Sequence, residues 1–201
     1  MTAAAPAATL YIGSMTDTAP DWGDKVRSDY LATDALAALL WAMQPANALA
    51  AEVALATGWR IDDVLHLKTE QLNHAAQLKR PRLRVLEKKT GKPSTRYISR
   101  PLLERMRKQA GRRWCFEGAR DWRKPRTRQA VYYDLKKAAS KFGLPQNISP
   151  HTLRKNYAVY LRHNGKTLGQ VQRTLNHSNA MTTMLYMYAD RLTEQKKNPG
   201  A

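Results

Sequence analysis

Arginine, histidine and tyrosine occur in this sequence at spacings that suit chemistry on a phosphodiester. Arg60 follows a Thr-Gly-Trp run, His151 lies three residues before Arg154, and His177 lies nine residues before Tyr186. Cleaving a phosphodiester without a metal requires cations around the nonbridging oxygens, a nucleophile in line with the leaving oxygen, and an acid that protonates that oxygen. Arginine, tyrosine, histidine and lysine can supply all three functions.

Hydrophobic periodicity predicts how these residues are positioned. Between residues 82 and 100 the period changes toward two around the turn-like segment 89–92, which predicts a β-hairpin. Gly58 can adopt positive φ and end a helix, which would present Arg60 at a corner. The predicted fold is mostly α with a small antiparallel β-sheet (α+β). Helices are expected over residues 33–43, 47–57, 61–67, 102–109, 128–142, 151–163, 168–175 and 180–189.

Basic residues are concentrated in the middle of the chain. The 34 Lys and Arg against 16 Asp and Glu give a net charge of +18, and residues 79–141 carry 22 of the basic residues. Such a surplus predicts a polyanionic partner, with nucleic acid as the first candidate. The sequence contains no phosphate-binding Gly-rich loop and no Cys/His spacing that would hold zinc, which disfavours nucleotide hydrolysis and zinc fingers.

The sequence offers no candidate membrane anchor. The uncharged stretch Ala35–Ala51 is too short to span a bilayer and contains Pro45, so two Ala-rich core helices that meet at a break are expected there. Cys115 is the only cysteine, and the first residues lack the basic region of a secretory signal. These features predict a cytoplasmic protein.

Together, the motifs resemble the catalytic domain of the tyrosine recombinase (phage integrase) family. The family carries T-G-x-R, a hairpin lysine before Thr-Gly, H-x-L-R, and L-G-H with a tyrosine nine residues after its histidine. Here these are Thr57–Arg60, Lys89, His151–Arg154, and Leu175–His177 with Tyr186, in the same order. The resemblance covers residues 33–188.

The resemblance implies a role for each of these residues. Arg60 and Arg154 would clamp the scissile phosphate, and His177 would donate a hydrogen bond to it. Tyr186 would be the nucleophile, with His151 receiving its proton. Lys89 would protonate the departing 5′ oxygen.

Alternatives stay open for several positions. Lys88 and Lys92 are rivals of Lys89, and Arg60 could instead form a surface salt bridge with Asp62 or Asp63. Either histidine could be a buried structural residue. Asp63 corresponds to a family position that orients the catalytic cations, or it is an ordinary exposed carboxylate. Tyr188 is expected to pack or to lie on the surface.

Two features depart from the family pattern. Asn176 stands where the family usually has glycine, although asparagine tolerates positive φ. Residues 1–32 form an expected loosely structured lead-in, too short for the helical domain that usually precedes the catalytic domain. The chain is therefore either an excised catalytic domain or a single-domain member similar to the short fimbrial DNA invertases. The expected catalytic domain covers residues 33–190, and residues 191–201 form a polar tail.

The implied activity is site-specific recombination of double-stranded DNA through a 3′-phosphotyrosyl intermediate, with no metal or other cofactor. The resemblance also implies a homotetramer on synapsed sites and accessory DNA-bending proteins, in a bacterial, phage or mobile-element setting. Two alternatives are relaxation of DNA by a type IB topoisomerase and a regulatory DNA-binding protein of the same fold that has lost catalysis.

Overall fold

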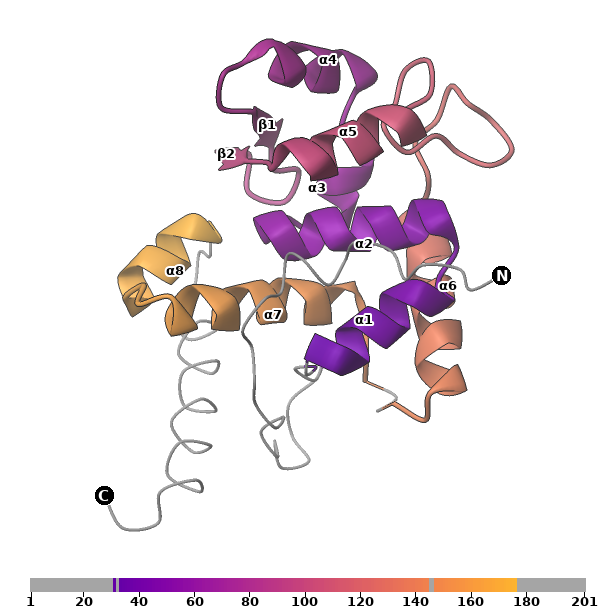
Figure 1. Cartoon of the computed structure of the whole chain (residues 1–201), viewed down its shortest axis with the longest axis vertical. Coiled ribbons are helices and arrows are strands. Elements are labelled where there is room, and N and C mark those ends of the chain that lie inside the picture. Colours follow the sequence, from indigo (N-terminus) through magenta and orange to yellow (C-terminus); the bar gives the residue numbers. More distant parts are fainter. Residues whose placement is uncertain (1–30, 32, 145–146, 177–201) are drawn as a thin grey trace.

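A computed structural model describes residue 31, residues 33–144 and residues 147–176 of the chain. These residues form a mostly helical fold with a small two-stranded antiparallel sheet, as the sequence predicts (Figure 1). The elements in chain order are α1 (Thr33–Ala42), α2 (Pro45–Thr57), α3 (Ile61–Leu65), α4 (Thr69–Gln77), β1 (Arg82–Leu86), β2 (Pro93–Tyr97), α5 (Arg100–Gln109), α6 (Arg128–Lys141), α7 (Pro150–His163) and α8 (Leu168–Thr174).

Helix α2 is the centre of the structure. It packs against α1, α3, α5, α6 and α7, and its many alanines allow neighbouring helices to approach closely. Pro45 stands in its first turn, so the predicted pair of Ala-rich helices that meet at this proline is confirmed. Large side chains from several elements fill the core around it, among them Trp59, Phe116, Leu135 and Leu153.

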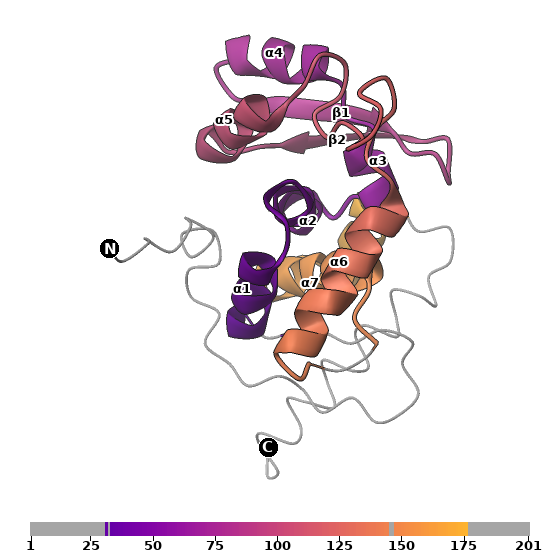
Figure 2. The ribbon, with the colours of Figure 1, turned by 90° about the vertical axis from the view of Figure 1, so that its right-hand side faces the viewer.

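The hairpin lies between α4 and the layer formed by α2 with α1, α6 and α7 (Figure 2). Strands β1 and β2 pair in register from Arg82 opposite Tyr97 to Leu86 opposite Pro93, and burial alternates along β1 so that Leu83 and Val85 face inward. The predicted hairpin is therefore confirmed. Helix α4, which covers it, is absent from the sequence-based expectation. No helix in the described ranges has the length and apolar character needed to cross a membrane.

Some expectations concern residues outside the described part of the chain. They are residues 1–30 and 32 of the expected lead-in, the helix over residues 180–189, the polar tail, and the positions of His177, Tyr186 and Tyr188. Helix α8, the last described helix, ends at Thr174, shortly before the segment that carries these three residues.

Candidate active site

The corner between α2 and α3 holds Arg60 in place. Gly58 caps α2 with φ of 68°, and a Cβ at this position would lie 2.1 Å from the ring of Tyr157. Trp59 is buried and its Nε1 donates to Ser94 Oγ at 2.8 Å, which anchors the corner to β2. Arg60 is then the N-cap residue of α3. In the Thr-Gly-x-Arg motif, Gly58 thus ends α2, Trp59 anchors the corner in the core, and Arg60 begins the next helix. The predicted corner is confirmed.

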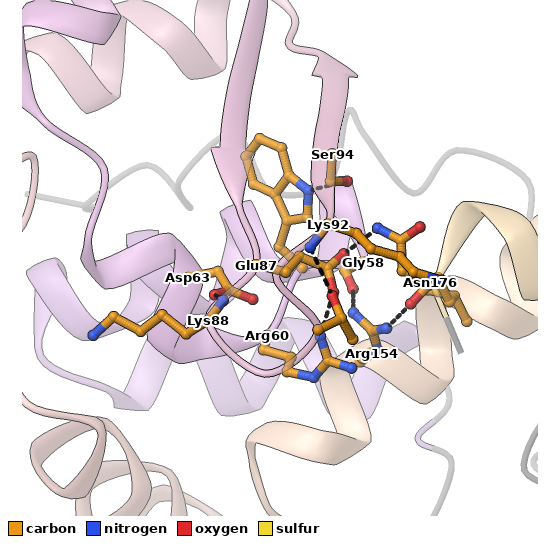
Figure 3. A network of polar contacts seen from close by, with 12 residues as sticks. Gly58, Arg60, Asp63, Glu87, Lys88, Lys92, Ser94, Arg154 and Asn176 are labelled. Carbon is orange, nitrogen blue, oxygen red and sulfur yellow. Dashed lines mark hydrogen bonds and ion pairs between the residues drawn. The ribbon is translucent and has the colours of Figure 1, made fainter. Parts of the chain in front are cut away.

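Arg154 connects two of the motifs directly. It lies on α7 with 2% of its surface exposed, and its Nη1 donates to the carbonyl of Gly58 at 2.6 Å. Its Nη2 donates to the carbonyl of Leu175 (Figure 3). A guanidinium has five N–H donors in a planar fork, so one such group can serve several acceptors at once. The fold brings the Thr-Gly-x-Arg corner and Leu175, the first residue of the Leu-Asn-His motif, together around this side chain.

His151 lies in the first turn of α7, where Ser149 caps the helix. The residue retains solvent-exposed surface. Its pKa is lowered, first by the partial burial of the ring and then by nearby positive charges. The charges, in decreasing order of effect, belong to Arg154, Arg60, Lys155 and Lys89. A lowered pKa keeps the imidazole neutral at pH 7, so His151 can accept a proton there.

Two neighbouring lysines of the hairpin loop, Lys88 and Lys89, differ in their surroundings. Lys88 points away from Arg60 and Arg154 (Figure 3), and its Nζ lies 3.3 Å from Asp62 and 2.7 Å from Nε2 of His66. Lys89 is exposed, and its charge contributes to the lowered pKa of His151. Lys88 is thus paired with groups outside the Arg60–Arg154 cluster, and Lys89 stays the predicted lysine of the site.

Asp63 is buried, with 3% of its surface exposed, so the alternative of an ordinary exposed carboxylate is wrong. Its Oδ1 accepts the backbone N–H of Lys88 at 3.0 Å, which ties α3 to the hairpin loop. Burial raises its pKa more than the Lys88 hydrogen bond lowers it. The hydrogen bond from the Lys88 N–H to Asp63 positions the hairpin backbone.

Glu87 is a site residue that the sequence reasoning missed. The side chain is 1% exposed and forms an ion pair with Nη1 of Arg60. The predicted alternative partners of Arg60, Asp62 and Asp63, are therefore wrong. The only hint in the sequence is an acidic residue that interrupts the basic run between the end of a strand and the Lys-Lys-Thr-Gly turn.

Asn176 adopts φ of 49°, which explains how it replaces the usual glycine before His177. Its side-chain amide donates to Glu87 Oε1 at 2.8 Å. The structure thus brings Arg60, Arg154, His151 and the Lys89 loop together. His177 is the next residue and Tyr186 follows nine residues after it, and both lie outside the described residues.

Comparison with known proteins agrees with this geometry. A sequence profile of the phage integrase family matches residues 29–192. The tyrosine recombinase XerD of Lacticaseibacillus casei is 31% identical over 146 residues, which cover 68% of this chain and 48% of the relative. XerD of Staphylococcus aureus (strain N315) is 30% identical over 147 residues, covering 70% of this chain and 49% of the relative. The chain thus spans about half the length of these relatives.

Solved structures share the fold at low sequence identity. The crystal structure of XerA recombinase superposes with a TM-score of 0.65 and 20% identity, over 92% of this chain and 68% of the other. The catalytic domain of bacteriophage HP1 integrase gives a TM-score of 0.59 and 22% identity, over 87% of this chain and 99% of the other. With the profile match over most of its length, the chain belongs to the phage integrase family, and its fold is that of a tyrosine recombinase catalytic domain.

Proposed function

We propose that the chain is a site-specific DNA recombinase that cleaves and rejoins double-stranded DNA through a 3′-phosphotyrosyl intermediate at Tyr186. The observation that carries this proposal is the set of contacts that gathers the motif segments: Arg154 donates to the carbonyls of Gly58 and Leu175, and Glu87 of the hairpin holds Arg60. A cationic centre beside a neutral proton acceptor suits a phosphodiester, whose charge grows in the transition state. The XerH recombinase, whose structure shares this fold, has been crystallised bound to its difH substrate.

In the proposed reaction, Tyr186 Oη attacks the scissile phosphorus and its proton passes to His151. The new P–Oη bond replaces the bond to the 5′ oxygen, which leaves with a proton from Lys89. Arg60 and Arg154 balance the charge of the nonbridging oxygens, and His177 donates a hydrogen bond to one of them. The phosphotyrosyl ester retains the energy of the broken bond, so attack by a 5′ hydroxyl reseals a strand without an external energy source or a cofactor.

The proposed partner is duplex DNA, bound by a homotetramer that holds two synapsed sites, with accessory DNA-bending proteins as further candidates. The proposed setting is the cytoplasm of a bacterium that carries the protein on its chromosome, on a phage or on a mobile element. Lambda integrase, whose structure shares this fold, has been crystallised bound to a COC′ core site, which supports DNA as the proposed partner.

The test is a denaturation-resistant adduct with a nicked duplex from which the cleaved end diffuses away. Nicked duplexes tiled across the DNA that flanks the coding sequence serve as substrates. Wild type and Tyr188→Phe should form the adduct, and Tyr186→Phe should not. Arg154→Ala should reduce cleavage more than DNA binding. An adduct that persists in Tyr186→Phe contradicts the nucleophile, and a wild type that reacts with no duplex contradicts the proposed enzyme.

A further inference from the structure

Glu87 lies at the point where three segments of the site meet. Its Oε2 contacts Nη1 of Arg60 and accepts from Thr90 Oγ1 at 3.3 Å, while its Oε1 accepts from the Asn176 amide at 2.8 Å. Its backbone also closes the hairpin loop, because its N–H donates to Lys92 and its carbonyl accepts from Gly91. The side chain is 1% exposed, so none of these contacts competes strongly with water.

The turn that leads to His177 is held at three successive residues by three charged side chains. Arg96 donates to the carbonyl of Thr174, and Arg154 donates to the carbonyl of Leu175. Glu87 accepts from the side chain of Asn176. Each of the three comes from a different element or loop. Such a repeated restraint fixes the backbone of Thr174 and Leu175 and the side chain of Asn176, the three residues that precede His177 in the sequence.

We propose that Glu87 is a positioning residue that couples the Arg60 clamp to the segment carrying His177, an inference that rests on the proposed function. One carboxylate oxygen fixes Arg60 and the other fixes Asn176. Nη1 of Arg60 donates to Glu87. The other N–H groups of the Arg60 guanidinium donate to no described residue, so they are available to a phosphate. The contact therefore orients the guanidinium and leaves it able to bind substrate.

The role of Glu87 requires two acceptor oxygens, which a carboxylate has and an amide lacks. In Glu87→Gln, one atom of the amide becomes a donor and must face either Arg60 or Asn176, which are themselves donors. Asn176→Asp places two carboxylates side by side. The double variant Glu87→Gln/Asn176→Asp restores the pairing with reversed polarity, because the new amide then donates to the new carboxylate and still accepts from Arg60. It also keeps the net charge of the cluster unchanged.

The measurement is the single-turnover rate of adduct formation on nicked duplex, together with duplex affinity. Each single variant should slow the reaction about 10- to 100-fold, as substitution of supporting residues commonly does, with little change in affinity. The double variant should recover most of the lost rate. Glu52→Gln is the matched control, because it removes a carboxylate that pairs with Arg105 at 2.6 Å and forms no hydrogen bond or ion pair with Glu87, Arg60 or Asn176, and its rate should equal that of wild type.

Urea unfolding of wild type, the two single variants and the double variant gives the coupling between positions 87 and 176 without DNA. A rate recovered in the double variant and a clear coupling support the inference. Zero coupling overturns it, and so does a Glu87→Gln protein that cleaves at the wild-type rate. A wild type without any adduct contradicts the proposed function instead, and the coupling free energy still decides whether Glu87 connects the two segments.

Discussion

In the proposed reaction, His151 accepts the proton of Tyr186 and Lys89 donates a proton to the departing 5′ oxygen. Burial and four cations lower the pKa of His151, so the ring is neutral and ready to receive a proton. Lys89→Gln removes one of these cations, so the pKa of His151 should rise toward its ordinary value, as followed by NMR titration. Lys88→Gln is the matched control, since Lys88 is directed to Asp62 and His66. Equal shifts in both variants would contradict the assignment of Lys89.

The same substitution tests Lys89 as the general acid. Losing a general acid slows a reaction about 100- to 10,000-fold, so Lys89→Gln should cleave that much more slowly. A nicked duplex with sulfur at the bridging 5′ position should restore the rate, because a thiolate leaves without protonation. If Lys89→Gln stays slow on the sulfur substrate, Lys89 has a role other than proton donation.

Motif residues and supporting residues differ in how far the sequence predicts them. Arg60, His151 and Arg154 are predicted from short motifs that are local in sequence and from the family resemblance that these motifs carry. Glu87 was missed because its burial depends on Arg60 and Asn176, which are 27 and 89 residues away. A glutamate beside a Lys-Lys turn is ordinarily solvated, so only the tertiary structure shows this role.

The end of α2 is the element boundary on which the clamp depends. Gly58 needs both its positive φ and the absence of a side chain, because a Cβ would meet the Tyr157 ring at 2.1 Å. Gly58→Ala should therefore lower the free energy of unfolding by about 2 to 4 kcal/mol in urea denaturation. Gly165→Ala is the control. Gly165 has φ of 75° with nothing within 4 Å, so backbone strain of about 1 kcal/mol remains. Equal losses would show that the Tyr157 contact is unimportant.

Asp63 links α3 to the hairpin loop, and its raised pKa gives that link a pH dependence. A folded-state pKa above the unfolded value means that ionisation favours the unfolded chain, so wild type loses stability as the pH rises through the raised pKa. Asp63→Asn keeps an acceptor for the Lys88 N–H and has no charge. Its unfolding free energy relative to wild type should therefore increase between about pH 4 and 7. A difference that is constant or falls over this range would contradict the raised pKa.

Helices with an apolar stripe were predicted well, and α4 shows where periodicity fails. Only Leu72 and Ala75 of α4 are buried, so the apolar face of Thr69–Gln77 spans about one turn, which is too short to show a repeating period in the sequence. Its first turn also contacts residues far along the chain, since the Thr69 N–H donates to the carbonyl of Arg113 and the Gln71 side chain donates to the carbonyl of Arg84. The hairpin, by contrast, has alternating apolar residues at Leu83 and Val85 and a turn sequence, and these identify it without tertiary information.

The charge of the whole molecule predicts how it meets DNA. A net charge of +18, concentrated in the middle of the chain, should make binding to any duplex strongly dependent on salt. Affinity for a non-specific duplex should fall about 1,000-fold or more between about 50 and 200 mM salt in a fluorescence titration. Arg154→Ala removes one candidate phosphate contact, so the slope of log affinity against log salt concentration should change by only about 1. A nearly salt-independent affinity would rule out a phosphate-binding face.

The central claim is that the assembled cations activate one tyrosine of the C-terminal segment. It is tested most directly by trapping the adduct on nicked duplex, digesting both polymers and locating the nucleotide by fragmentation mass spectrometry. Tryptic cleavage after Arg173 and Arg191 yields one peptide that contains both Tyr186 and Tyr188. The account predicts a 3′-phosphonucleotide on Tyr186. A nucleotide on Tyr188 or on any other residue would contradict it.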